Sequence, residues 1–246
     1  MKEKIKETYL KLKSESGSHS PSIETLLEII GESTLKHDFC FLSNPLATEI
    51  FKSELNKLID DKIRWNRTVE AYPPQNRAVA SYLSEVLNVN RENIIIGNGA
   101  VEIIQMVLHK YVKENIMIIL PTFSPYYEYL NDTIRIEYFH LKKENNFQLN
   151  TGELVRKCRE KGIKNLVLIN PNNPTGTYIP RKEVLTLFSE LKELDNIIID
   201  ESFIDFAYEG EFEANLSTVN HIKDYPNVIL VKSMSKDFGI AGIRCG

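Results

Sequence analysis

The sequence predicts an α/β fold with three layers, in which helices cover both faces of a mainly parallel sheet. From about residue 45 onward, short apolar runs rich in Ile and Val alternate with helix-like stretches. The runs show little polar alternation, which is typical of strands buried on both faces of a parallel sheet. Strand and helix patterns in alternation indicate βαβ units and therefore a layered α/β fold.

The expected strands are short, and most are followed by polar or glycine-containing segments. They are Asn93–Gly97, Ile116–Leu120, Ile134–Tyr138, Leu166–Asn170, Ile197–Asp200 and Val228–Val231. The expected helices are Pro74–Leu87, Ala100–Tyr111, Gly152–Arg159 and Arg181–Leu194. Ligands of open α/β sheets bind at the carboxyl ends of the strands. The residues directly after each apolar run are therefore the candidates for chemistry.

The N-terminal part of the chain has a different character. Residues 1–13 predict a short polar helix, and Ile23–Ile30 predicts a second one. Between them, Ser14–Ser22 is rich in Ser, Gly and Pro and predicts a linker. We therefore expect an N-terminal arm and linker over residues 1–44 and one large domain over residues 45–246, a length that can bury a sizeable core.

The composition argues against several functional classes. The formal net charge of −4 gives no general attraction to nucleic acid or to a membrane surface. Cys40, Cys158 and Cys245 are far apart, so neither a disulfide framework nor a metal site is predicted. No apolar run approaches the length of a membrane span, and the charged N-terminus lacks the apolar segment of a secretory signal. A cytoplasmic protein is the expectation.

Two segments after the early strands could bind a ligand. The turn Gly97–Gly99 opens the helix expected at Ala100, and such a turn presents free backbone N–H groups to an anion such as phosphate. A plain turn is the alternative, because loop glycines commonly adopt positive φ. Phe123, after the second run, could stack on a flat ring or pack in the core as most aromatic residues do.

Two later runs end in more distinctive patterns. The heptapeptide at residues 170–176, Asn-Pro-Asn-Asn-Pro-Thr-Gly, is more elaborate than a plain turn requires. Asp200 ends an apolar run, where a carboxylate is unfavourable unless it is paired. A protonated pyridine nitrogen is one such partner. A helix N-cap or a salt bridge is the alternative.

The segment after the last run brings together hydroxyl, amine and guanidinium groups. Ser233, Ser235, Lys236 and Arg244 lie close together in the sequence. A lysine amine can form an imine with an aldehyde, and an arginine can hold a phosphate through a forked contact. A lone lysine is usually a solvated surface residue, but these neighbours favour a chemical role.

Together these segments resemble the fold type I enzymes that use pyridoxal phosphate, in the branch of histidinol-phosphate aminotransferases and threonine-phosphate decarboxylases. The resemblance covers residues from about Asn44 to Gly246. It rests on the heptapeptide at residue 170, Asp-Glu-x-Phe-Ile-Asp-Phe from Asp200, and Ser-x-Ser-Lys-x-Phe-Gly-x-Ala-Gly-x-Arg from Ser233. It implies the large cofactor-binding domain of a homodimeric enzyme that acts on small-molecule amino acids and oxo acids.

The resemblance also implies a role for each matching residue. Lys236 is expected to form the Schiff base with the cofactor and later to shuttle protons. Asp200 is expected to pair with the pyridine nitrogen, so that the ring can accept electrons from a carbanion. Asn173 is expected to hydrogen-bond the ring hydroxyl, and Phe123 to stack on the ring face.

The cofactor phosphate has a larger set of implied partners, which combine backbone amides and side chains. They are Gly99, Ala100, Val101, Ser233, Ser235 and Arg244. Tyr72 matches a tyrosine that reaches the cofactor phosphate of the partner subunit, so the active site would need two chains. Asn44 lies in the segment that lines the substrate entrance.

The sequence departs from the family pattern at several positions. Phe203 stands where many of the aminotransferases carry a tyrosine, and phenylalanine in this frame is closer to the threonine-phosphate decarboxylases. Val101 replaces a frequent aspartate, and Ala47 replaces a glycine. In the opposite direction, residues 233–239 are more similar to the aminotransferases. His19 is followed by Ser-Pro-Ser, and so matches the decarboxylases' His-Gly-Gly-Asn only weakly.

The main functional prediction is an aminotransferase that moves an amino group between a small amino acid, which could be phosphorylated, and a 2-oxo acid or related carbonyl compound. The alternative is a decarboxylase similar to threonine-phosphate decarboxylase. Both reactions need Lys236, Asp200 and Asn173. A third hypothesis is a non-catalytic module or one half of a fusion, against which retention of that whole set argues. The family pattern continues past Gly246 into a smaller domain with a substrate-binding arginine, so we expect a fragment.

Overall fold

The computed structural model describes residues 2–15, 23–31, 37, 44–210 and 216–246. Contacts divide the chain into two compact units, Met1–Ser43 and Asn44–Gly246. The first unit holds α1 (Lys2–Glu15) and α2 (Ile23–Ile30), at about the predicted positions. His19, Cys40 and most of the predicted linker lie outside the described residues.

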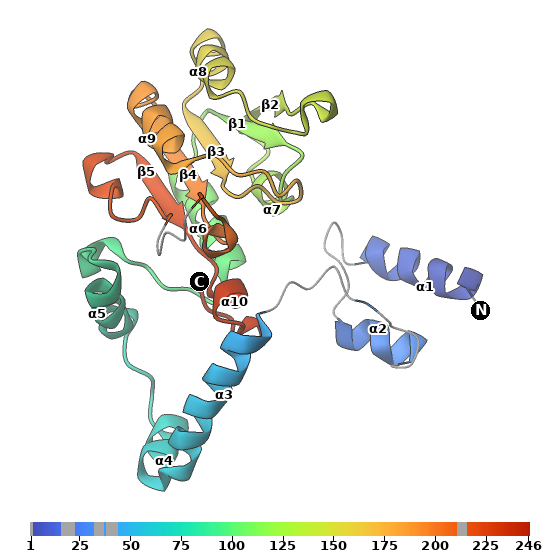
Figure 1. Cartoon of the computed structure of the whole chain (residues 1–246), viewed down its shortest axis with the longest axis vertical. Helices are drawn as coiled ribbons and strands as arrows, with labels where there is room; N and C mark the ends of the chain where they lie inside the picture. Colours follow the sequence, from blue (N-terminus) through green and yellow to red (C-terminus); the bar gives the residue numbers. More distant parts are fainter. Residues whose placement is uncertain (1, 16–22, 32–36, 38–43, 211–215) are drawn as a thin grey trace. The chain divides into compact units, whose positions relative to one another are not determined.

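The second unit is built on a parallel sheet of five strands, and β2 and β5 lie at its edges (Figure 1). The strand order is β2-β1-β3-β4-β5, and every neighbouring pair is parallel. The strands are β1 (Asn115–Leu120), β2 (Arg135–His140), β3 (Asn165–Ile169), β4 (Asn196–Asp200) and β5 (Val228–Val231). Each coincides within two residues with a predicted apolar run.

Two hydrophobic cores lie on the opposite faces of this sheet. Alternate residues of a strand point to opposite faces, and in β3 Leu166 and Leu168 join one core while Val167 and Ile169 join the other. The first core is completed by α8 (Thr151–Glu160) and α9 (Arg181–Glu190). The second is completed by α6 (Ala100–Tyr111) and α7 (Pro125–Glu128). The predicted three-layer fold is confirmed.

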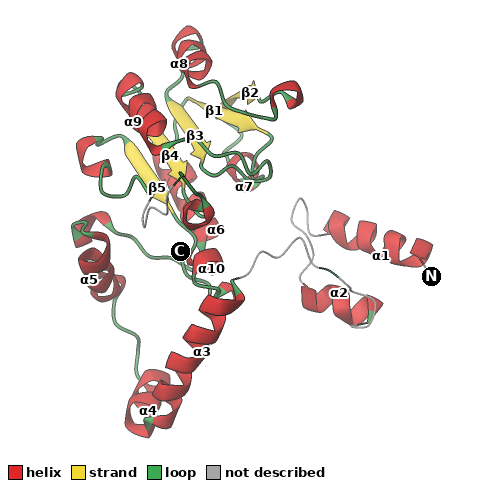
Figure 2. Cartoon of the chain, viewed as in Figure 1, coloured by secondary structure: helices red, strands yellow, loops and turns green. Residues whose placement is uncertain are grey.

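The remaining helices lie away from the sheet or are single turns, as the colouring by secondary structure shows (Figure 2). The longer ones are α3 (Pro45–Asp60), α4 (Lys62–Glu70) and α5 (Asn76–Leu87). The short turns are η2 (Arg91–Asn93), η3 (Lys143–Asn145), η4 (Ile204–Phe206), η5 (Ile222–Asp224), α10 (Met234–Asp237) and η6 (Ala241–Ile243). Within the described part of the chain, no helix combines the length and apolarity needed to cross a membrane.

The predicted strand at Asn93–Gly97 is wrong for this structure. Asn93 ends η2, and the next four residues are extended without joining the sheet. A strand needs a row of backbone partners from another segment, and within the described residues only Gly97 of this stretch has a distant one: its N–H and C=O groups bond reciprocally with Gly246, at 3.0 and 3.2 Å. The segment still leads into α6, as the sequence predicts.

Candidate active site

The loops that follow four neighbouring strands meet at one edge of the sheet. Parallel strands place their carboxyl ends at the same edge, and backbone bonds join the ends of β3, β4 and β5: Asn170 N–H donates to Asp200 O, and Glu201 N–H donates to Val231 O, both at 2.9 Å. The Asn172 amide donates to Pro121 O at 3.1 Å, which joins the loop after β3 to the loop after β1. Most of the predicted site residues lie in these loops.

Asp200 ends β4 and is only 4% exposed. Its carboxylate accepts hydrogen bonds from Tyr126 Oη at 2.8 Å and from the backbone N–H of Ser202 at 2.9 Å. Burial raises the pKa of Asp200, and the hydrogen bonds from Ser202 and Tyr126 oppose that rise. Because both donors are neutral, the carboxylate could still accept a cationic N–H partner.

Lys236 lies on α10, a single helical turn that is tied to the loop of Asp200. Ser233 caps this turn by accepting the Ser235 N–H at 3.3 Å, and the Ser233 N–H donates to Ser202 Oγ at 3.0 Å. Burial, and then the charge of Arg244, lower the pKa of Lys236. A lower pKa raises the fraction of free amine, which is the nucleophilic form.

Two polar groups on α10 that could contact a ligand, the hydroxyl of Ser235 and the amine of Lys236, have no hydrogen-bond partner in the described part of the chain, and Asp237 Oδ1 has none there either. The Ser235 hydroxyl is buried and makes no hydrogen bond. The amine of Lys236 has no acceptor there either, and its Nζ lies 5.7 Å from the centroid of the Phe203 ring. A buried hydroxyl without a partner is unfavourable, so both groups are available to a ligand.

Arg244 lies over the N-terminus of α6. A Cβ atom added to Gly99, the N-cap of this helix, would be 2.5 Å from Arg244 Nη2. Gly99 has a φ of 88° and no side chain to cap the helix, and its own N–H donates to Gly97 O at 2.9 Å. Because the first N–H groups of a helix lack internal acceptors, those of Ala100 and Val101 remain beside the guanidinium. This combination favours an anion.

The heptapeptide after β3 uses two of its three asparagines to hold its own shape. The Asn170 side chain bonds reciprocally with the backbone of Ile179, at 2.8 and 2.9 Å. The Asn172 amide donates to Thr175 Oγ1 at 2.8 Å as well as to the loop after β1. The side chain of Asn173 is half-buried and makes no hydrogen bond within the described residues. Of the three asparagines, Asn173 alone is therefore free for a ligand within the described residues. It is also the asparagine for which the resemblance implies a contact with the cofactor ring.

Three other predicted residues occupy different kinds of position. Phe123 is partly buried against the core on the α6 side of the sheet. Tyr72 is 100% exposed in the loop between α4 and α5, so its side chain packs against no other residue that the structure describes. The Asn44 amide donates to Asp237 O at 2.9 Å, and its Oδ1 caps α3 at Ala47 N. The predicted substrate role of Asn44 stays a prediction.

The residues at this edge fit pyridoxal phosphate on their own chemistry. An aldehyde needs a free amine, which Lys236 offers, and a phosphate needs donors such as Ser235 Oγ and Arg244. A protonated ring nitrogen needs a buried carboxylate, which Asp200 offers. A ring oxygen needs a donor, and the amide of Asn173 has no other partner among the described residues.

The sequence analysis missed Tyr126 and Lys232. Tyr126 is fully buried on α7, and burial together with the charge of Asp200 raises its pKa well above the ordinary value. Its place three residues after Phe123, just beyond a strand end, was the available signal. Lys232 directly follows β5 and forms ion pairs with Asp205 and Asp237. A charged residue directly after an apolar run was the signal there.

Comparison with known proteins places the chain among related enzymes. The family described as aminotransferase class I and II matches residues 39–246. An L-serine phosphate decarboxylase of Campylobacter jejuni is 45% identical over 96% of this chain. A histidinol-phosphate aminotransferase of Flavobacterium psychrophilum is 32% identical over 72% of this chain. The chain spans 60% of the length of the first relative and 50% of the second.

A solved structure agrees with the first relative. The structure of a decarboxylase from Sulfurospirillum multivorans superposes with a TM-score of 0.85 and 41% identity, and the match covers 94% of this chain and 58% of the other.

These similarities contradict the main functional prediction, an aminotransferase, and favour the alternative. The decarboxylases are more similar to this chain than the aminotransferase is, and they match nearly its whole length. The physical reason for the error is that both reactions use the same cofactor-holding residues. Motifs around Lys236 and Asn173 therefore identify the cofactor but not the bond that is broken.

Proposed function

The chain belongs to the class I and II aminotransferase family, whose cofactor is pyridoxal phosphate, and on that premise we propose that it is the cofactor-binding part of an amino-acid decarboxylase. The substrate class is a phosphorylated amino acid of the L-serine phosphate type. One observation carries the proposal: a relative with this activity is 45% identical over 96% of the chain. The activity and substrate are proposed for the whole protein.

The residues of the sheet edge would hold the cofactor at its two ends. Arg244, Ser235 and the first N–H groups of α6 would bind the phosphate, because they combine charge with unpaired donors. At the other end, Asp200 would keep the ring nitrogen protonated. Asn173 would donate to the ring oxygen. The assignments of Ser235 and Asn173 rest on polar groups that lack partners in the described chain, and that of Asp200 rests on a buried carboxylate whose two donors are neutral.

Bound pyridoxal phosphate supplies an electron sink that accepts the electron pair left behind when carbon dioxide departs. Asp200 supports this sink, because its buried carboxylate favours a proton on the ring nitrogen. Lys236 Nζ would deliver the proton that takes the place of the carboxylate on the α-carbon. Phe203 offers only a ring face near this amine, so it supplies no competing hydroxyl proton.

A homodimer is the proposed assembly, and the surface of α3 to α5 supports it. Neither α3 nor α4 has a buried residue, and α5 has one, Ala80. Several large apolar side chains on these helices and the loop at Tyr72 are more than half exposed: Leu46, Ile50, Ile63, Val69, Tyr72, Tyr82 and Val86. Extended apolar surface of this kind marks a site of association. A second copy would cover it and bring Tyr72 to a neighbouring site.

The test is to separate the two reactions by their products. The protein is incubated with pyridoxal phosphate and L-serine phosphate, and released carbon dioxide and the phosphorylated amine are measured by isotope label. The proposal expects both products in equal amounts, and neither with Lys236→Ala. Conversion of the cofactor to its amine form with release of a 2-oxo acid, without carbon dioxide, would contradict it.

A further inference from the structure

The turn that bears Lys236 cannot hold its own position. α10 has four residues, and a helix this short is not stable in isolation, because nucleation is unfavourable. The direction of the Lys236 side chain therefore depends on contacts between α10 and its surroundings. On the C-terminal side of Lys236, these contacts are made to Asp237 and Gly239.

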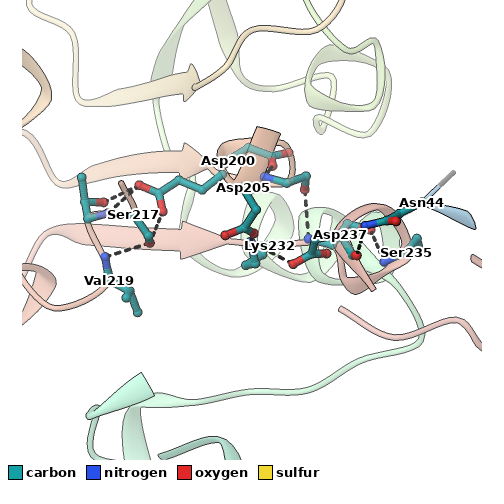
Figure 3. A network of polar contacts seen from close by, with 12 residues as sticks. Asn44, Asp200, Asp205, Ser217, Val219, Lys232, Ser235 and Asp237 are labelled. Carbon is teal, nitrogen blue, oxygen red and sulfur yellow. Dashed lines mark hydrogen bonds and ion pairs between the residues drawn. The ribbon is translucent and has the colours of Figure 1, made fainter. Parts of the chain in front are cut away.

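Lys232 makes the charged contact. Its ammonium lies between Asp205 of η4 and Asp237 of α10, as Figure 3 shows. The Nζ atom is 3.3 Å from Asp237 Oδ2 and also pairs with Asp205 Oδ2. Lys232 is 27% exposed and Asp237 only 13%. The cluster therefore joins three segments: the loop after β4, the end of β5 and the turn of Lys236.

Uncharged contacts hold the same turn from another element. The Asn44 amide donates to Asp237 O at 2.9 Å, and Thr48 Oγ1 donates to Gly239 O at 2.7 Å. Both residues lie at the start of α3. A Cβ atom added to Gly239 would collide with the backbone oxygen of Asn44, so the two segments are in close contact. Asp237 is thus held at its carbonyl by α3 and at its carboxylate by Lys232.

We propose that Lys232 is a positioning residue, whose ion pair with Asp237, backed by Asp205, fixes α10 and so the place of the Lys236 amine. Asp237 is the sequence neighbour of Lys236, so a shift of its carboxylate moves the backbone that carries the amine. Without Lys232, Asp237 and Asp205 would face each other with no cation between them, and they would either repel each other or take up a shared proton. Either change would move the carboxylate of Asp237 away from its present place, and the turn with it. This inference rests on the proposed role of Lys236 in attaching the cofactor.

The experiment measures attachment of the cofactor at Lys236 rather than turnover. The protein is mixed with pyridoxal phosphate, reduced with borohydride at intervals, and the modified fraction of Lys236 is measured by mass spectrometry. With Lys232→Met we expect the rate to fall by at least about 10-fold, because small displacements of a reacting group can cost about 100-fold. Lys232→Arg should retain most of the rate, since arginine keeps the charge and can pair with both carboxylates.

Two further variants separate positioning from general stability. Asp237→Asn removes the same ion pair with little change of shape, and is expected to slow labelling as well; it also serves if Lys232→Met does not fold. Arg156→Met breaks the exposed pair with Glu160 on α8, at 2.6 Å, and is expected to leave the rate unchanged. Circular dichroism and the melting temperature of each variant are recorded without cofactor.

The outcomes distinguish the positioning role of Lys232 from the proposed role of Lys236 in attaching the cofactor. Slow labelling of folded Lys232→Met and Asp237→Asn, with recovery in Lys232→Arg, supports the proposal. Labelling at the wild-type rate in both folded variants overturns it, even if their melting temperatures fall. Absence of labelling in the wild-type protein contradicts the proposed role of Lys236 itself, and this inference fails with it.

Discussion

Arg244 adds to the effect of burial on the charge state of Lys236, the amine proposed to attach the cofactor. Its positive charge lowers the pKa of Lys236, in addition to the larger effect of burial. Arg244→Met removes a cation that disfavours the ammonium form, so the pKa of Lys236 should rise. The pH profile for labelling of Lys236 by pyridoxal should then shift to higher pH, with slower labelling at pH 8. Pyridoxal lacks the phosphate, so lost phosphate binding does not contribute. Arg244→Lys should keep the wild-type midpoint, and an unshifted Arg244→Met profile would refute the coupling.

Tyr126 is hydrogen-bonded to Asp200, so it should influence the proposed hold of Asp200 on the cofactor. Its hydroxyl donates to the buried carboxylate at 2.8 Å and opposes the rise in the pKa of Asp200. Tyr126→Phe removes that donor, so the pKa of Asp200 should rise further and its hold on a cationic ring nitrogen should weaken. A hydrogen bond to a charged group contributes about 1.5–3 kcal/mol, so cofactor affinity should fall by about 10-fold or more. The affinity is measured by absorbance titration, with Tyr127→Phe as control. Equal affinities in the two variants would show that Tyr126 only fills space.

In the heptapeptide after β3, Asn170 has a structural role and Asn173 is proposed to bind the cofactor. Asn170 is 2% exposed and satisfies the backbone of Ile179 in both directions. Asn170→Ala leaves a buried N–H group unpaired, so it should lower the free energy of unfolding by about 1–3 kcal/mol. Asn173→Ala should leave the unfolding free energy of the cofactor-free protein within about 0.5 kcal/mol, and weaken cofactor binding instead. Urea unfolding and absorbance titration of both variants test this division, which fails if Asn173→Ala is the less stable of the two.

The elements that the sequence predicted well are those whose partners are local or regular. β1, β3 and β4 appear as apolar runs because both faces of each are buried, and α6 begins at Ala100 as the glycine turn indicates. The segment at residues 93–97 has the same composition, but a strand also needs a neighbour, which composition does not encode. α10 is too short for a periodic signal. Its place depends on Lys232 and Asn44, which are distant from each other in sequence.

At the scale of the whole molecule, the sequence identified the cofactor more readily than the reaction. Groups that hold a cofactor are set by its chemistry, so the residues proposed to hold it, Lys236, Asp200 and Asn173, are readable as motifs. The choice between decarboxylation and transamination depends on which bond of the α-carbon stands perpendicular to the ring. Substrate-binding groups make that choice, and they follow no short motif in this chain.

The exposed surface of α3 to α5 leads to the last prediction, that each active site is shared by two chains. If Tyr72 serves the partner's cofactor, Tyr72→Ala and Lys236→Ala proteins should each be defective, for different reasons. In a mixed dimer, the Tyr72→Ala chain keeps its own Lys236 and receives an intact Tyr72 from its partner, so one of the two sites is complete. Random exchange of subunits should restore about a quarter of the sites.

The measurement for this prediction is cofactor trapped on Lys236 of the Tyr72→Ala chain, before and after subunit exchange with Lys236→Ala protein. Sedimentation analysis of the mixture verifies that dimers form and exchange. A gain in trapped cofactor places the partner's Tyr72 at the site, because the Lys236→Ala chain itself has no amine to label there. If dimers exchange and trapping does not increase, Tyr72 acts within its own chain or not at all. The exposed apolar surface would then be an interface without a catalytic contribution.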